Sequence, residues 1–368
     1  MTSEKRLRAR ELGISIGRLS PGRWNAITDV PGIRVGHATL IEGDGPLVVG
    51  QGPIRTGVTV IMPNDNIKAE PLFAGYHVLN GCGEMTGLVW VAESGLLVSP
   101  IALTNTYSVG VVHDALIALD VAWGLPVAAE TYDGFLSDIK GMHVRAEHVR
   151  AAIDSASGGP VAEGCVGGGT GMICHGFKGG IGTSSRVLAT DQGGWTVGVL
   201  VQANHGQREL LRVNGVPVGH IINSREVPNP WDMNLPAQIA TSSIIVVVAT
   251  DAPLLPIQCR RLAQRASLGV GRAGGLGENS SGDIFITFST ANQNLAQDCP
   301  PGEALSVRML PHDALTPLFE AVADATEEAI VNALCAATTT VGLDGHTAQA
   351  LPLDRLQAVM HQYARGNS

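Results

Sequence analysis

The segment that most constrains the fold is residues 236–255, PAQIATSSIIVVVATDAPLL. Within it, residues 244–249 are six consecutive apolar residues, and all but the last are β-branched. Asp251 and Pro253 follow directly and end the run. A short, continuous, β-branched run closed by Asp and Pro predicts a strand that is buried on both faces. Such a strand needs a layer of structure on each side of its sheet.

Two serines, Ser242 and Ser243, directly precede this predicted strand. Serines at the start of a strand are ordinary loop residues in most proteins, and this segment alone favours that interpretation. The alternative is a chain that cuts itself before Ser243, which then carries a hydroxyl and a free α-amine. An α-amine has an unperturbed pKa of about 8, so it can act as general base for a hydroxyl nucleophile.

The rest of the chain alternates short apolar strands with amphipathic helices. We expect strands at 33–39, 58–62, 88–91, 197–202 and 284–289, and helices at 109–123, 144–154, 254–266, 312–336 and 353–364. The glycine-dense residues 164–182 are predicted not to be helical, and the proline-rich residues 207–242 to be an exposed linker. Strands interleaved with helices predict an α/β fold in which the sheet is covered.

Charge and cysteine usage exclude several classes of protein. The 368-residue chain has a net charge of −9 and no basic stripe, which argues against a nucleic-acid partner. It has no 18-residue apolar span and no apolar core near its N-terminus, so we expect no membrane segment and no signal peptide. Its six cysteines are scattered without a CxxC pair, which favours buried thiols and a cytoplasmic location.

Three familiar motifs can be set aside. Residues 269–274 fit GxGxxG, but a helix is expected before them and a strand after them, the reverse of a dinucleotide site. No HExxH is present, and His143 and His148 lie five residues apart, so we expect no metal site. The chain also lacks the GxSxG elbow of an α/β-hydrolase.

Other candidate residues stand at the ends of predicted strands. Ser281 and Asp283 precede the strand at 284–289, and Asn204 follows the strand at 197–202. Each alone is more typical of a turn, although an amide such as that of Asn204 can donate to a developing oxyanion. Glu130, followed by Tyr132, comes directly after an apolar run. Alone, Glu130 is more typical of a solvated loop acid than of a cleft carboxylate.

Several long motifs in order resemble the self-processing aminopeptidases of the DmpA type. These enzymes include the L-aminopeptidase/D-esterase-amidases and the related β-peptidyl aminopeptidases. The matching segments span most of the chain: residues 25–37 (NAITDVPGIRVGH), 164–182, 243–254 (SIIVVVATDAPL), 281–285 (SGDIF) and 351–354 (LPLD).

The resemblance implies a four-layer αββα sandwich with an architecture like that of the Ntn hydrolases. Residues 1–368 would then form a single α/β domain, processed into a large chain of 1–242 and a small chain of 243–368. No metal or organic cofactor is implied, and the expected assembly is a homo-oligomer, a tetramer of such two-chain units.

The resemblance also implies roles for single residues. By this resemblance Ser243 would be the nucleophile, and Ser281 and Asp283 would relay the proton and orient the amine. Asn204 would donate to the oxyanion. Glu130 would receive the ammonium of the substrate, and Tyr132 would line the same pocket. Two positions depart from the family pattern, since relatives often have Glu at position 283 and Gly or Asn at position 242. Ser242 is the alternative nucleophile.

The predicted function is therefore removal of N-terminal residues from short peptides, amides and esters through a seryl acyl-enzyme. The substrate is expected to carry a free amino terminus. Within the same family the alternative is β-peptidyl aminopeptidase specificity. Two further alternatives are an acyltransferase like ornithine acetyltransferase and an unprocessed scaffold protein without catalytic activity.

Overall fold

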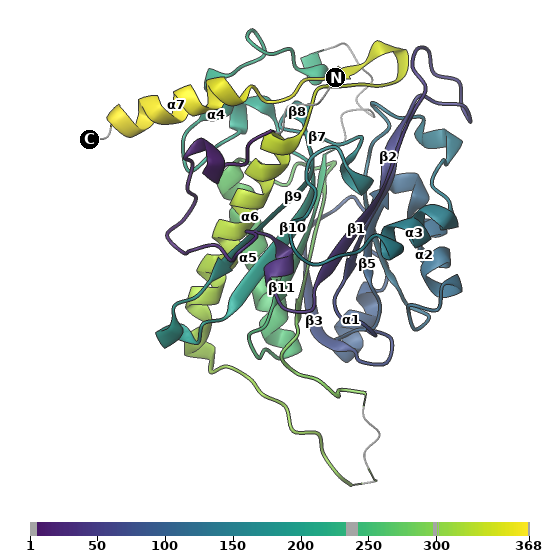
Figure 1. The fold of residues 1–368 in the computed structure, drawn as a ribbon, viewed down its shortest axis with the longest axis vertical. Helices are drawn as coiled ribbons and strands as arrows, with labels where there is room; N and C mark the ends of the chain where they lie inside the picture. Colours follow the sequence, from purple (N-terminus) through teal and green to yellow (C-terminus); the bar gives the residue numbers. More distant parts are fainter. Residues whose placement is uncertain (1–5, 233–241, 297–299, 301, 367–368) are drawn as a thin grey trace.

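The computed structural model describes residues 6–232, 242–296, 300 and 302–366. Two β-sheets lie face to face at the centre, and helices cover the outer face of each (Figure 1). The order of layers is helices, sheet, sheet, helices. This confirms the αββα sandwich expected from the sequence.

The larger sheet contains the strand predicted to be buried on both faces. Its strand order is β4 (Leu96–Leu97), β3 (Leu72–Gly81), β12 (Gly282–Ser289), β11 (Ser243–Thr250), β10 (Thr196–Asn204) and β9 (Gly180–Val187). Strands β11 and β12 are parallel, and the other neighbours are antiparallel. Helices α5 (Pro256–Ala273) and α6 (Thr316–Ala336) pack on its outer face.

The smaller sheet has four strands in the order β1 (Arg34–Glu42), β2 (Ile54–Met62), β5 (Ile101–Asn105) and β6 (Val127–Thr131). Strands β5 and β6 are parallel, and the other two pairings are antiparallel. Helices α2 (Val109–Ala118) and α3 (Ala146–Asp154) pack against its outer face.

Shorter elements connect these layers. The remaining helices and strands are α1 (Leu88–Ser94), α4 (Val218–Ile221), α7 (Leu353–Gly366), β7 (Ile173–Cys174), β8 (Phe177–Lys178), β13 (Thr340–Val341) and β14 (Thr347–Ala348). Short 3-10 helices occur at Arg10–Leu12, Ile27–Asp29, Thr106–Ser108, Ile139–Gly141, Gly167–Gly169, Thr190–Gln192, Arg208–Leu210, Pro230–Asp232, His312–Leu315 and Leu343–Gly345.

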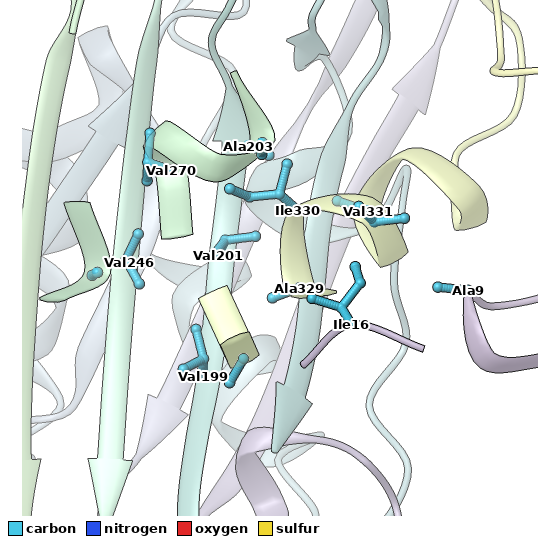
Figure 2. Packing of buried hydrophobic residues seen from close by; sticks show 14 of the residues in the cluster. Ala9, Ile16, Val199, Val201, Ala203, Val246, Val270, Ala329, Ile330 and Val331 are labelled. Atoms are coloured by element: carbon cyan, nitrogen blue, oxygen red, sulfur yellow. The ribbon is translucent and has the colours of Figure 1, made fainter. Parts of the chain in front are cut away.

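The side chains of β11 alternate between two hydrophobic cores. Ile244, Val246 and Val248 belong to the core beneath α5 and α6, whereas the intervening residues belong to the core between the sheets. Figure 2 shows Val246 in the first of these cores, which also contains Val201 of β10 and side chains of α6. Because successive strand residues point to opposite faces, a strand covered on both faces is apolar at every position.

The structure corrects two predictions. Residues 88–91, expected as a strand, begin α1, which left-handed glycines bound on both sides: Gly87 (φ 76°) and Gly95 (φ 72°). An apolar run this short does not distinguish a strand from a helix. Residues 207–232 are not an exposed linker, because Arg208 and Val218 are among several buried side chains there. Residues 233–241 lie outside the described part of the chain.

The GxGxxG segment lies mostly inside a helix. Helix α5 continues to Ala273, so Gly269 and Gly271 are helical. A Cβ on Gly269 would lie 2.5 Å from Cβ of Thr326 in α6. This glycine therefore allows two helices to approach closely and does not form a phosphate-binding loop.

None of the helices in the described residues is long and apolar enough to cross a membrane.

We predict that Gly182→Ala destabilises the protein. A Cβ at Gly182 in β9 would lie 2.0 Å from the carbonyl oxygen of Ala329 in α6, so the helix must move away from the sheet. Overpacking of this kind costs about 1–3 kcal/mol, measured as the free energy of unfolding in urea. Gly110→Ala in α2 is the control, since among the described residues no atom beyond its chain neighbours and the backbone of its own helix lies within 4 Å of a Cβ there. The control should gain about 0.5–1 kcal/mol, and equal effects of the two substitutions would contradict the packing argument.

Candidate active site

Three strands of the larger sheet meet where Ser243 begins β11. Ser243 pairs with Asn204 at the end of antiparallel β10 and with Gly282 at the start of parallel β12. Ser281 and Asp283 stand on either side of Gly282. The sheet topology thus brings four of the predicted site residues, Ser243, Asn204, Ser281 and Asp283, together at one end of these strands.

The hydroxyl of Ser243 lies beside the peptide bond that precedes it. Ser243 is 4% exposed, and its Oγ donates to the carbonyl oxygen of Ser242 at 2.6 Å. The backbone N–H of Gly282 donates to Ser243 Oγ at 3.1 Å and to the Ser242 carbonyl oxygen at 3.2 Å. A hydroxyl next to a carbonyl that accepts from a fixed backbone donor is suited to acyl transfer.

Ser281 and Asp283 form a buried pair. Ser281 Oγ donates to Asp283 Oδ1 at 2.6 Å, and both residues are buried. Burial raises the pKa of Asp283 to about 6, and the Glu278 carboxylate also raises it. The hydrogen bonds from Ser281 and the Ile244 backbone act in the opposite direction. Asp283 can therefore exchange a proton close to neutral pH.

The side chain of Asn204 is held in one orientation. Its Oδ1 accepts from the Ile173 backbone N–H at 2.7 Å, and its Nδ2 donates to the Tyr132 carbonyl oxygen at 3.1 Å. These contacts use one of the two amide hydrogens of Nδ2. Asn204 also lines a cavity of about 200 Å³ together with Ser242 and Trp231. The second amide hydrogen is the one that could serve an oxyanion.

Glu130, on β6 of the smaller sheet, is a buried carboxylate. Its Oε1 accepts from the Glu84 backbone N–H at 3.0 Å, and its Oε2 accepts from the Thr106 hydroxyl. Burial raises the pKa of Glu130. None of the ion pairs among the described residues includes Glu130. A buried carboxylate in this state favours the arrival of a cation.

The Glu130 carboxylate lies close to the start of β12. A Cβ on Gly83 would lie 3.2 Å from Glu130 Oε1 and 3.0 Å from Cα of Gly282, so Gly83 separates the two. Tyr132, two residues after Glu130, is partly buried, and burial raises the pKa of its phenol. Its carbonyl is the acceptor for Asn204, which links the two sheets at this point.

Two further residues contact the site and were not predicted. Thr106 donates to Glu130, but it begins a short 3-10 helix after β5 and leaves no signal in the sequence. Glu278 Oε2 lies 3.5 Å from the Ser242 hydroxyl, while its buried Oε1 has no partner among the described residues. An acid three residues before Ser281 could have indicated this second carboxylate.

Comparison with known proteins finds similar chains over almost the whole sequence. The model of peptidase family S58 matches residues 25–348. The beta-peptidyl aminopeptidase BapA of Sphingosinicella microcystinivorans is 50% identical over 370 residues, which covers 97% of this chain and 93% of that protein. The protein of the same name from Sphingosinicella xenopeptidilytica is 44% identical, and the match covers 96% of this chain and 90% of that protein.

Two solved structures share the whole fold. A Burkholderia sp. beta-aminopeptidase superposes with a TM-score of 0.88 at 54% identity, covering 97% of this chain and 99% of that one. The L-aminopeptidase D-Ala-esterase/amidase of Ochrobactrum anthropi superposes with a TM-score of 0.87 at 44% identity and the same coverage. The latter is described as a prototype for the serine aminopeptidases and a variant of the Ntn hydrolase fold.

The raised pKa of Asp283 predicts that Asp283→Asn stabilises the uncut chain at neutral pH. An unfolded Asp loses its proton at about pH 4, whereas the folded one does so at about 6. Between these values the folded state holds more protons, so the stability associated with Asp283 is present below pH 4 and lost as pH rises through 6. The gain from Asn should grow from pH 4 to pH 7, to at most about 3 kcal/mol.

Urea unfolding of Asp283→Asn at both pH values measures this gain. The measurement is best made in a Ser243→Ala background, which lacks the hydroxyl expected from the sequence to cleave the chain. Asn can still accept the hydrogen bond from Ser281. A stability difference that does not change between pH 4 and pH 7 would contradict the raised pKa.

Proposed function

Because the chain belongs to peptidase family S58, we propose that it is a self-processing serine aminopeptidase. It removes the N-terminal residue from short peptides, amides and esters that carry a free amine. The observation that carries this proposal is the contact of the buried Ser243 hydroxyl with the Ser242 carbonyl, to which Gly282 also donates. Membership of a peptidase family favours a hydrolase over the acyltransferase and scaffold alternatives.

Maturation begins with attack of Ser243 Oγ on the carbonyl carbon of Ser242. The C–N bond breaks, an ester forms between the Ser242 carbonyl and Ser243 Oγ, and the hydroxyl proton passes to the released amine. The N–H of Gly282 stabilises the charge that develops on the carbonyl oxygen. Water then hydrolyses the ester, which leaves chains of 1–242 and 243–368 from the single folded unit.

In the processed enzyme, the Ser243 hydroxyl attacks the substrate carbonyl. Its own α-amine takes the proton, and the hydrogen-bonded pair of Ser281 and Asp283 orients that amine. The free Nδ2 hydrogen of Asn204 stabilises the oxyanion. Leaving-group departure gives a seryl acyl-enzyme that water hydrolyses. These steps require neither a metal nor an organic cofactor.

Glu130 recognises the substrate's ammonium, and Tyr132 lines the same pocket. The carboxylate is buried, has two hydrogen-bond donors and lacks a cationic partner among the described residues. Pairing with an ammonium would offset the cost of burying this charge. The ion pair would also position the scissile carbonyl against Ser243.

The named relatives favour β-amino acids as the second candidate specificity. Two relatives at 50% and 44% identity are beta-peptidyl aminopeptidases, and the Burkholderia structure is a beta-aminopeptidase. The Ochrobactrum enzyme, at 44% identity, is an L-aminopeptidase. Rates with aminoacyl p-nitroanilides and their β-homoamino equivalents would separate the two specificities.

We also propose a cytoplasmic location and a homo-oligomer, the tetramer of two-chain units implied by the family resemblance. Five cysteines, Cys82, Cys165, Cys174, Cys259 and Cys335, are free thiols, as expected in a reducing compartment. Large apolar side chains such as Val89 (86%) and Leu276 (69%) are exposed and suit contacts between copies. Light scattering of the purified protein would distinguish a tetramer from a monomer. No nucleic-acid or membrane partner is proposed.

We predict that Ser243→Ala remains a single chain without activity. The N→O acyl shift needs a hydroxyl at this position, and alanine removes it. Ser242→Ala is the matched control, because it changes the neighbouring hydroxyl and keeps the carbonyl that is attacked. Intact-mass spectrometry should show two chains for this control and one for Ser243→Ala. Normal cleavage of Ser243→Ala would move the nucleophile to Ser242.

Glu130→Gln should still cleave itself but lose substrate recognition. The Glu130 carboxylate contacts the incoming ammonium and not the Ser242–Ser243 bond. Removing one partner of a buried charge pair costs about 2–5 kcal/mol, read from the fall in kcat/KM. N-acetylated substrates should fail with the wild-type enzyme for the same reason. Efficient hydrolysis of an N-acetylated amide would show that Glu130 does not select for a free amine.

A further inference from the structure

Two segments outside the proposed reaction bring three metal-binding side chains together. Cys174 ends β7, His175 follows in the turn to β8, and His205 follows β10. One potential ligand atom from each lies within 4.8 Å of the others, and all three residues are buried. Neutral imidazole and thiolate are the ligands that Zn²⁺ prefers.

One nitrogen of the His175 imidazole makes a hydrogen bond, and this bond leaves the lone pair of the ring on the other nitrogen. Nδ1 lies 2.9 Å from the backbone carbonyl oxygen of Gln207, so a neutral ring donates from Nδ1. The lone pair is then on Nε2, which is buried and has no partner among the described residues. Metal-binding histidines generally donate their second N–H to a carbonyl or carboxylate in this way.

Cys174 and His205 have the separation of two ligands of one ion. Sγ of Cys174 lies 3.8 Å from Nδ1 of His205. Tetrahedral zinc, with Zn–S of about 2.3 Å and Zn–N of about 2.0 Å, separates sulfur and nitrogen by about 3.5 Å. Burial lowers the pKa of His175 to about 4 and that of His205 well below its usual value, so both rings are neutral.

The backbone holds the two segments in register. The N–H of His175 donates to the carbonyl oxygen of His205 at 2.7 Å, and Nε of Arg208 donates to the His175 carbonyl oxygen at 3.0 Å. His175 has a left-handed backbone (φ 50°), which is uncommon for a residue other than glycine. Gly206 is required beside it, since a Cβ there would lie 2.4 Å from His175 Nδ1.

The charges around the cluster include both signs. Glu278 lies near Cys174 and helps burial raise the pKa of its thiol to about 12, whereas Lys178 acts in the opposite direction. Arg208 lies near His175 and helps lower its pKa. Cysteine ligates a metal as its thiolate, so binding displaces the thiol proton of Cys174, and the thiolate offsets part of the metal's charge.

We propose that Cys174, His175 and His205 form a binding site for Zn²⁺, with the fourth coordination position open to water. The site joins the β7–β8 turn to the end of β10 and takes no part in the hydrolysis. The same two segments hold Asn204, because Ile173 donates to its side chain. Sequence spacing predicts no such site, since two of the ligands come from residues 174–175 and the third lies about thirty positions later.

Cobalt titration of the tag-free, chelator-treated wild-type protein tests this site directly. Co²⁺ replaces Zn²⁺ in such sites, and its spectrum reports ligand type and geometry. We expect one equivalent of bound Co²⁺ per copy of residues 1–242, a thiolate-to-cobalt charge-transfer band, strong tetrahedral d–d bands and release of one proton. Added Zn²⁺ should bleach the spectrum. Absence of bound Co²⁺, or a bound ion without the thiolate band, would overturn the proposal.

Matched cysteine variants assign the thiolate. Cys174→Ser should weaken Co²⁺ binding at least 100-fold and remove the charge-transfer band. Cys259→Ser changes another buried thiol, whose Sγ lies 3.7 Å from the Phe73 carbonyl oxygen. This variant should leave Co²⁺ binding and the charge-transfer band unchanged. Unaltered binding and spectrum in Cys174→Ser would overturn the assignment. If that variant does not fold, the wild-type spectrum and proton release still decide the matter.

Discussion

Strand β11 has helices on one face and the second sheet on the other, and its eight residues are all buried. Hydrogen bonding to β10 and β12 fixes it on both edges as well. The start of such a strand has little freedom to move, because any shift would disturb two cores and two ladders. The sheet itself therefore holds Ser243 in hydrogen-bonding position to the Gly282 N–H, and no loop movement is needed.

A second constraint on the site is a set of hydrogen bonds between the two sheets. Gln202 of β10 donates through its amide to the Thr104 carbonyl and the Thr131 hydroxyl, and Asn204 donates to the Tyr132 carbonyl. These bonds pair amide donors that are buried between the sheets, where an unpaired donor would be costly. They fix the end of β6, and hence Glu130, relative to the edge that carries Ser243. The residues proposed for substrate recognition and for nucleophilic attack thus lie on different sheets, and these hydrogen bonds fix one relative to the other.

Periodicity predicted the elements that have strong patterns. The regions of β1, β2, β10 and β12 and of the five longer helices were expected, and most errors at their ends are a few residues. The strand expected at 88–91 failed because its short run carries no period. Strands β3, β5, β6 and β9 were not predicted. Strand β3 is partly exposed, and β9 contains glycines such as Gly182, whose place depends on close contact with α6. The linker prediction failed because proline content does not reveal the partners that bury Arg208.

The sequence by itself determined the buried strand, the hydroxyls at its entrance and the family resemblance that links distant motifs. These are patterns of neighbouring residues or of motifs in a fixed order, so they can be recognised in the sequence without a structure. Only the tertiary structure decided that Asn204, Ser243 and Gly282 lie together, that Glu130 is buried and forms no ion pair among the described residues, and that Glu278 and Thr106 join the site. It also gathered Cys174, His175 and His205. Pairing and burial join residues far apart in the chain, and no spacing along the sequence records such contacts.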